Sequence, residues 1–256
     1  MTYGYMLGLE QPDTHISIPK GRRVTGNAIG IILLDVVCCP MLPGDVANAT
    51  TFNFPVQYKV LEGVTAERVF RADPGVLAEV IKGGKELEKQ GVRAITTDCG
   101  FFGNYQKEVA AALNVPVFLS SLLQIPLIIR ALKPNQKVGV ICADATSLSP
   151  SLLSACGIDD LSTIVVAGVQ DLPESKNIPL CTGQFNSFKI EQELVNLATQ
   201  LVNDNPDIGA LLLECSDMPP YSWSIQKAVN LPVFDFITMI NWVYDAVVRR
   251  PFAGFM

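Results

Sequence analysis

The sequence is poor in the residues that build metal sites and charged binding surfaces. Its 256 residues include a single histidine, His15, and charged side chains make up only 17% of the chain. No cysteines and histidines cluster with the spacing of zinc ligands, so we expect no bound metal. The net charge is −6 and no patch rich in lysine or arginine stands out, so nucleic acid is not an expected partner.

Signatures of cofactor binding and membrane insertion are also missing. The chain has neither a Gly-x-Gly-x-x-Gly nor a Walker pattern, the glycine-rich loops that hold phosphates, and we expect no cofactor. Its apolar stretches are interrupted by Asp35, Gln124, Pro126 or Arg130, which argues against a membrane-spanning helix. The odd number of cysteines, seven, and the lack of a signal-peptide pattern at the N-terminus predict a cytoplasmic protein with free thiols.

Apolar residues, in contrast, make up 49% of the chain and recur in short runs separated by helical patterns. This alternation is typical of α/β proteins in which helices cover both faces of parallel sheets. We predict two similar lobes, residues 27–132 and 133–232, with residues 233–256 packing back onto the first. The predicted strands are residues 28–37, 58–62, 94–97, 115–119, 137–143, 163–169, 210–213 and 231–236. The predicted helices are residues 74–90, 104–113, 121–132, 149–156, 185–203, 220–229 and 238–248.

An internal repeat supports the two-lobe interpretation. When the chain is shifted by 116 positions, residues 94–118 align with residues 210–234, and eight of the 25 positions are identical. Chance would give about one or two identities at ordinary residue frequencies. Among the identical pairs are Cys99 and Cys215, each of which lies two residues past the end of a predicted strand. The two halves therefore resemble copies of one α/β unit.

The repeated cysteines predict a shared active site. Ligands of open α/β sheets bind at the carboxyl ends of the strands, so two lobes related by a pseudo-two-fold axis would place Cys99 and Cys215 on opposite walls of one cleft. Two thiols on opposite faces of a carbon can act as base and acid, with their sulfurs about 7 Å apart. A predicted helix start follows each cysteine, and we expect it to lower the thiol pKa. The alternative is that both are small buried core residues, as free cysteines commonly are.

The segments Thr96–Phe101 (TTDCGF) and Leu211–Ser216 (LLLECS) resemble the aspartate/glutamate/hydantoin racemase superfamily. The loop Pro43–Phe52 is similar to the substrate-side loop of that superfamily. The resemblance implies proton transfer without pyridoxal phosphate, next to the carboxylate or carbonyl of a small acid or cyclic ureide, in a homodimer or larger homo-oligomer. The pair Ser216-Asp217 departs from the Thr-His that usually follows the second cysteine of glutamate racemases, which leaves the substrate open.

We therefore predict an isomerase that racemises or epimerises a small amino-acid-like or hydantoin-like acid, with Cys99 and Cys215 as catalytic residues. The alternatives are a cis–trans isomerase of a small dicarboxylic acid and a two-lobed binding protein without catalysis. The roles of Asp35, Asp98 and Glu214 stay open between assistance to the thiols and structure. The predicted substrate-binding residues, which could instead cap helices or form turns, are Thr97, Gly100, Phe101, Ser120, Ser121, Ser216, Asn53 and Phe54.

Overall fold

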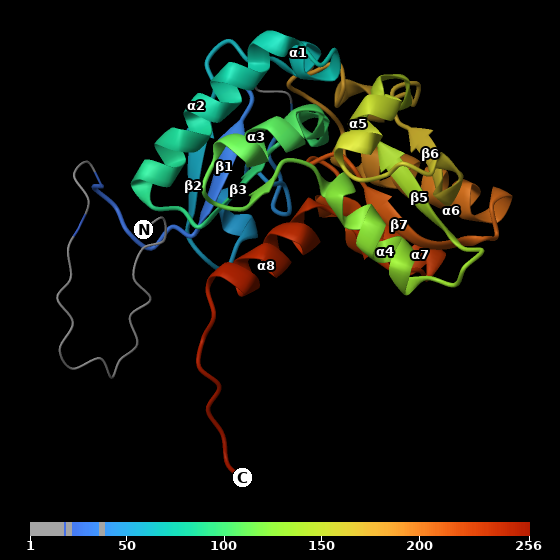
Figure 1. The fold of residues 1–256 in the computed structure, drawn as a ribbon. Helices are drawn as coiled ribbons and strands as arrows, with labels where there is room; N and C mark the ends of the chain where they lie inside the picture. Colours follow the sequence, from blue (N-terminus) through green and yellow to red (C-terminus); the bar gives the residue numbers. More distant parts are fainter. Residues whose placement is uncertain (1–17, 19–21, 36–38) are drawn as a thin grey trace.

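The computed structural model describes residue 18, residues 22–35 and residues 39–256, which form two parallel four-stranded sheets side by side (Figure 1). The strand order is β2-β1-β3-β4 in the first sheet and β6-β5-β7-β8 in the second, so one topology occurs twice. The predicted α/β fold with two similar lobes is confirmed. The strands are β1 (Ile29–Leu33), β2 (Val56–Val60), β3 (Ala94–Thr97), β4 (Val117–Phe118), β5 (Lys137–Cys142), β6 (Ile164–Gly168), β7 (Ile208–Leu213) and β8 (Val233–Phe234).

Helices cover these sheets largely where the periodicity predicts them. The predicted helix 74–90 has the same bounds as α2. Asp73 caps the N-terminus of this helix, Pro74 is its first residue and Gly91 ends it at a φ of 96°. The short α1 was not predicted. The helices are α1 (Ala66–Phe70), α2 (Pro74–Gln90), α3 (Gln106–Ala112), α4 (Ile125–Ala131), α5 (Pro150–Ala155), α6 (Ser187–Asp204), α7 (Ser222–Val229) and α8 (Phe236–Val247).

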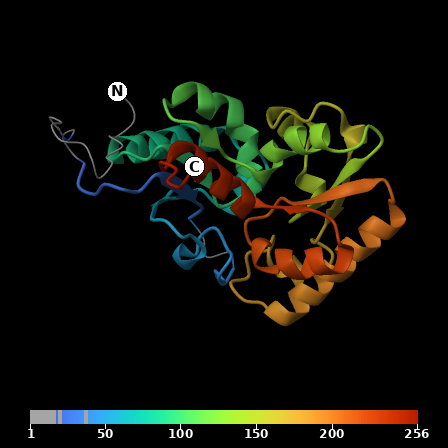
Figure 2. The same cartoon turned by 90° about the horizontal axis from the view of Figure 1, so that it is seen from below.

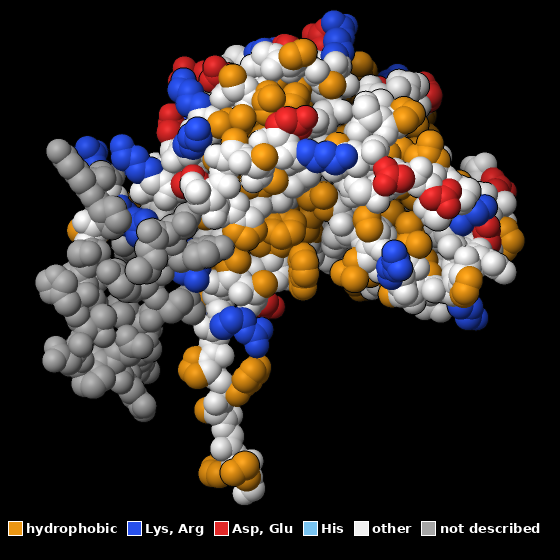
Figure 3. Space-filling model, viewed as in Figure 1, with side chains coloured by type: hydrophobic (Ala, Val, Ile, Leu, Met, Phe, Trp, Pro, Cys, Tyr) orange, Lys and Arg blue, Asp and Glu red, His pale blue; other side chains and the backbone are white. Residues whose placement is uncertain are grey.

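The last helix leaves the second lobe and returns to the first. Figure 2 shows α8 lying against the first lobe. Phe236, Met239 and Ile240 of this helix are buried in a cluster with Ile29 and Ala94 of the first sheet. This helix therefore joins the two lobes, although β8, which precedes it, pairs with β7. Between α4 and α8 lies an apolar groove of about 580 Å³, and Figure 3 shows apolar side chains gathered on this face.

A few predicted features fall outside the part of the chain that the structure describes. They are His15, Cys38 and the last two residues of the predicted first strand, residues 36–37. Among the helices of the described residues, none combines the length and the apolar character needed to cross a membrane.

Candidate active site

Cys99 and Cys215 lie two residues after the ends of β3 and β7, respectively, and both line one cavity between the lobes. The cavity measures about 40 Å³, which is room for a small molecule only. Each cysteine is 8% exposed. The remaining lining residues are Leu34, Met41, Asp45, Ala47, Ala66, Phe70, Asp98, Gly100, Phe101, Ala143, Ile178, Pro179, Cys181, Glu214, Ser216 and Asp217.

The same backbone arrangement holds both cysteines. The amide two residues further along, Phe101 N–H in one lobe and Asp217 N–H in the other, donates a hydrogen bond toward the sulfur. These matched contacts are the structural counterpart of the repeat in the sequence.

The acidic residue before each cysteine is also held in the same way. Both carboxyl oxygens of Asp98 accept from Leu34 N–H, at 3.1 Å, and Glu214 Oε2 accepts from Ala143 N–H, at 3.3 Å. Each carboxyl group thereby satisfies an amide just past the end of a neighbouring strand. Asp98 is fully engaged in this structural role, whereas Glu214 Oε1 is buried without a hydrogen-bond partner.

The electrostatics of the cavity correct one expectation. Burial, followed by nearby carboxyl groups, raises the pKa of both Cys99 and Cys215 well above the usual thiol value. The expected lowering by helix N-termini is therefore wrong. The 3-10 turn that follows Cys99 and the bend that follows Cys215 supply one amide each, which does not offset desolvation and carboxylate repulsion.

The surroundings of the two cysteines differ in one respect: Cys215 has a carboxyl partner. Its Sγ donates to Asp217 Oδ2, at 3.5 Å. Asp217 in turn shares a side-chain hydrogen bond with Asp45, which comes from the loop after β1 and is 2% exposed. The residue that corresponds to Asp217 after Cys99 is Phe101. Of the two repeated cysteines, Cys215 therefore has a carboxyl partner and Cys99 has Phe101 at the corresponding position.

Sequence reasoning missed Asp45 and Asp217, although both carry a readable signal. Asp217 stands two residues after Cys215, within the turn that also places the Asp217 amide on the sulfur. Asp45 follows Pro43-Gly44, a turn sequence, and its Oδ1 accepts from Ala47 N–H at 2.6 Å. An aspartate two residues after a cysteine that was predicted to be catalytic was the cue to include it.

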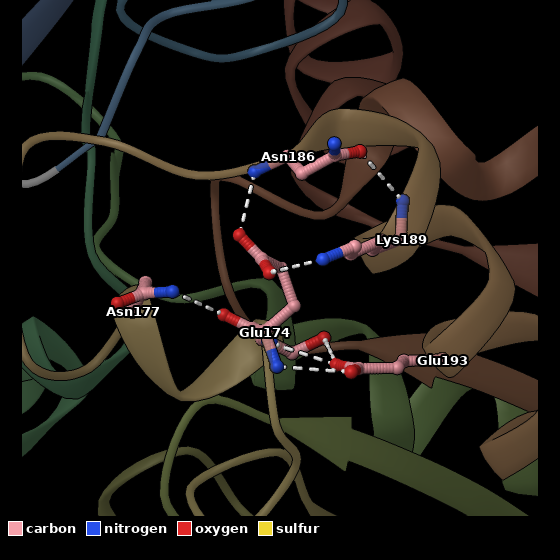
Figure 4. Close-up of polar contacts among 6 residues, drawn as sticks. Glu174, Asn177, Asn186, Lys189 and Glu193 are labelled. Carbon is pink, nitrogen blue, oxygen red and sulfur yellow. Dashed lines mark hydrogen bonds and ion pairs between the residues drawn. The ribbon is translucent and has the colours of Figure 1, made fainter.

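The second lobe closes the cavity with the segment that carries Ile178, Pro179 and Cys181. Two glutamates hold this segment to α6 (Figure 4). Glu193 accepts from the amides of Glu174 and Ser175, at 2.9 and 2.7 Å, and Glu174 accepts from Asn186 N–H at 2.7 Å. Cys181 is thereby held in the cavity wall.

Of the eight predicted substrate-binding residues, the structure brings Gly100, Phe101 and Ser216 to the cavity. Ser216 Oγ is already engaged, since it donates to the Asp98 carbonyl across the lobes. Gly100 lies so close to Glu214 that a Cβ at this position would be 2.0 Å from Glu214 Oε1. Glycine is therefore the residue that lets the lobes approach.

The other five predicted residues do not line the cavity. The hydroxyl of Thr97 donates to the carbonyls of Cys99 and Leu119, and that of Ser121 donates to backbone carbonyls of the second lobe. Ser120 caps the turn that precedes α4. These hydroxyls serve the backbone because the loops after β3 and β4 are fully buried there.

Asn53 and Phe54 lie elsewhere as well. They line a hollow beside the end of α8, where the ring of Phe54 stacks on Tyr244 with centroids 3.6 Å apart. Asp35 is exposed and accepts from Gly63 N–H, at 2.7 Å. None of the three contributes to the wall around the cysteines.

Solved structures with this fold include a variant of arylmalonate decarboxylase, with a TM-score of 0.56 at 15% identity over 89% of this chain and 98% of that one. A glutamate racemase from Bacillus anthracis gives 0.55 at 14% identity over 86% and 82% of the two chains. An aspartate racemase from Picrophilus torridus gives 0.51 at 14% identity over 89% and 96%. The fold is that of the aspartate/glutamate racemase superfamily, as the resemblance predicted.

Sequence relatives define the family more narrowly. No protein-family model matches the chain. It is 32% identical over 243 residues to a dimethylsulfoniopropionate lyase from Durusdinium sp. clade D, covering 92% of this chain and 80% of the relative. It is also 32% identical over 238 residues to dimethylsulfoniopropionate lyase 7 of Emiliania huxleyi, covering 89% and 69%. The chain belongs to the dimethylsulfoniopropionate lyase family.

These relatives overturn the predicted activity. The prediction of an isomerase that racemises amino-acid-like acids is wrong, because the relatives at 32% identity are lyases. The error has a physical origin. Two repeated cysteines indicate a shared site, but they do not indicate whether the reaction uses both faces of a carbon or one.

Proposed function

We propose that the protein is a lyase that cleaves dimethylsulfoniopropionate by β-elimination. In this substrate a dimethylsulfonium group stands on the carbon β to a carboxylate. A base removes the α proton, the electron pair of the C–H bond forms the Cα–Cβ double bond, and the Cβ–S bond breaks with both electrons going to sulfur. The products are dimethyl sulfide, acrylate and a proton on the base.

The observation that carries the proposal is the thiol–carboxyl pair of Cys215 and Asp217 in the cavity. The thiol proton passes to Asp217, so that the S–H bond breaks as an O–H bond forms, and the Cys215 thiolate takes the α proton. One base suffices for an elimination, and dimethyl sulfide leaves as a neutral molecule that needs no proton. Positioned bases of this kind contribute about 10²–10⁴-fold to a rate.

The charge of the cavity favours a cationic substrate. Asp45, Asp98, Glu214 and Asp217 line it, of which Asp217 holds the negative charge at neutral pH, and no lysine or arginine is found among its described lining residues. The rings of Phe70 and Phe101 lie beside each other in the wall, with centroids 4.3 Å apart. Aromatic faces bind onium cations through the ring quadrupole. We expect the sulfonium to lie against these rings and the carboxylate to lie at the amides of Gly100 and Ser216.

The proposal is tested by incubating the purified protein with dimethylsulfoniopropionate and measuring dimethyl sulfide in the headspace by gas chromatography and acrylate by NMR. Equal amounts of the two products are expected. The two substrates are compared in D₂O. Substrate deuterated at the α carbon should react more slowly than unlabelled substrate, because the C–H bond breaks in the elimination. Absence of dimethyl sulfide, or its release together with a hydroxypropionate instead of acrylate, would overturn the proposed elimination.

A further inference from the structure

A carboxyl group of the first lobe reaches the thiol–carboxyl pair of the second. Asp45 is almost fully buried and its side chain is hydrogen-bonded to that of Asp217. Its loop is fixed around it: Gly44 N–H donates to Thr51 Oγ1 at 2.9 Å, and Thr51 Oγ1 donates to the Asp45 carbonyl at 2.8 Å. The contact between the two aspartates therefore depends on the lobes being closed.

Hydrogen bonds decide which of the two aspartates holds the proton. Two carboxylates within hydrogen-bond distance in a buried site cannot both be ionised. Asp45 Oδ1 already accepts from Ala47 N–H, which leaves its other oxygen to carry a proton and donate. Asp217 already accepts from Cys215 Sγ, as an ionised carboxylate does. The proton thus belongs to Asp45 and the negative charge to Asp217.

The other ionisable groups near this pair leave that assignment unchanged. The described groups that face it, besides Cys215, are Asp98, Glu214, Cys39, Cys99, Tyr58 and Tyr221, and none of them is cationic. Burial, with the neighbouring Asp217, raises the pKa of Asp45 to about 10, so Asp45 keeps its proton at neutral pH.

We propose that Asp45 is a positioning residue whose carboxyl group donates to Asp217 and so keeps one negative charge in the Cys215–Asp217 pair. The inference rests on the proposed function, because it assigns the origin of the base in the elimination. Without this donor a buried Asp217 would take up a proton itself, and Cys215 would lose its proton acceptor. Asp45 does not touch the substrate in this role, because it acts through Asp217. Since the two aspartates belong to different lobes, Asp217 is kept ionised only when the lobes are closed.

The test follows the titration of Cys215, which requires no substrate. The ultraviolet absorbance of the thiolate is measured against pH in the full chain. The absorbance of the same variant carrying C215S is subtracted from that of each variant, which leaves the signal of Cys215. Asn keeps a donor at position 45, whereas Leu and Ala remove it. We expect D45N to titrate as the wild type does, and D45L and D45A to titrate about one pH unit lower or more, because a protonated Asp217 no longer repels the thiolate.

The turnover profile supplies a second readout. The acidic limb of kcat/KM for dimethyl sulfide release should move to higher pH in D45L and D45A, because Asp217 must lose its own proton before it can accept that of Cys215, with about a tenfold lower rate at neutral pH. D45N should recover most of that rate. D160N is the matched control, because Asp160 accepts from the amide two residues further along, as Asp45 does, but is exposed and distant from the cavity.

The outcomes separate the two proposals. If the wild type releases no dimethyl sulfide, the proposed function fails, while the thiolate titration still decides the role of Asp45. If D45L and D45A titrate Cys215 at the same pH as the wild type, or if D45N shifts as far as they do, Asp45 is not the donor. Melting temperatures of the variants exclude unfolding as the cause, and D45A replaces D45L should the larger side chain prevent folding.

Discussion

The backbone is arranged in the same way around Cys99 and Cys215, but the side chains beside the two sulfurs differ. Each cysteine lies past the end of the third strand of its sheet, and each sulfur accepts from the amide two residues further along. After Cys99, however, the side chain at that position is Phe101, and after Cys215 it is Asp217. The first site offers an aromatic wall and the second offers a proton acceptor at 3.5 Å.

The difference shows how a duplicated scaffold can serve one-sided chemistry. Inverting a carbon centre uses a base on one face and an acid on the other, and a symmetric pair of thiols suits that task. An elimination needs a base on one face only. In the proposed function the first site then binds the sulfonium, while the second removes the proton, and substitutions at equivalent positions should have unequal effects.

The largest expected difference concerns the cysteines themselves. C215S should lower kcat/KM for dimethyl sulfide release by about 10²–10⁴-fold, because it removes the base. C99S should lower it by about tenfold or less, since Cys99 contributes to the wall but accepts no proton in the elimination. Steady-state kinetics of both variants, at equal melting temperature, measure the ratio. Equal losses of kcat/KM in C215S and C99S would indicate a mechanism that uses both thiols.

The next comparison concerns Asp217 and its counterpart Phe101. D217N should lower kcat by about 10- to 100-fold and leave KM nearly unchanged, because the amide accepts no proton but keeps the shape of the turn. F101L should raise KM more than it lowers kcat, since it removes a cation-binding ring. The split between kcat and KM separates the two roles. A D217N enzyme that is as active as the wild type would mean that Cys215 needs no carboxyl partner.

The sequence allowed the scaffold to be predicted but not this asymmetry. The repeat carries Cys99 and Cys215 at identical places, and apolar runs such as residues 210–213 indicate the strands directly. Asp45 could not be paired with Asp217 in advance, because 172 positions separate them and only closure of the lobes brings them together. Hydroxyls such as that of Thr97 were misassigned because burial, which determines whether a side chain serves backbone or ligand, is a tertiary property.

A smaller difference is expected between Gly100 and its counterpart Ser216, where the lobes meet. A Cβ on Gly100 would lie 2.0 Å from Glu214 Oε1 and 2.7 Å from the Glu214 carbonyl, so G100A should cost about 1–3 kcal/mol through overpacking. S216A removes only the hydrogen bond to the Asp98 carbonyl and should cost about 0.5–1.5 kcal/mol. Urea unfolding of both variants tests the order. A G100A protein as stable as the wild type would show that the lobes can move apart without lowering the free energy of unfolding.

The smallest effect concerns the acids that precede the two cysteines and depends on pH. Burial raises the pKa of both Asp98 and Glu214 to about 8, well above the unfolded value of about 4. Between these values the folded protein keeps protons that the unfolded chain releases, so stability should fall as pH rises from about 4 to 8.

E214Q and D98N separate the contributions of these two acids. Gln cannot ionise, so E214Q should melt about 2–4 °C above the wild type near pH 8 and level with it near pH 5, a difference of roughly 1 kcal/mol. D98N should gain less, because the Asp98 carboxylate accepts from Leu34 N–H through both oxygens and Asn can offer only one. Calorimetric melting curves at the two pH values measure both slopes. If the melting temperatures of E214Q and the wild type change equally with pH, Glu214 is ionised in the folded protein. The second site would then carry a charge, which the buried, unpartnered Oε1 of Glu214 argues against.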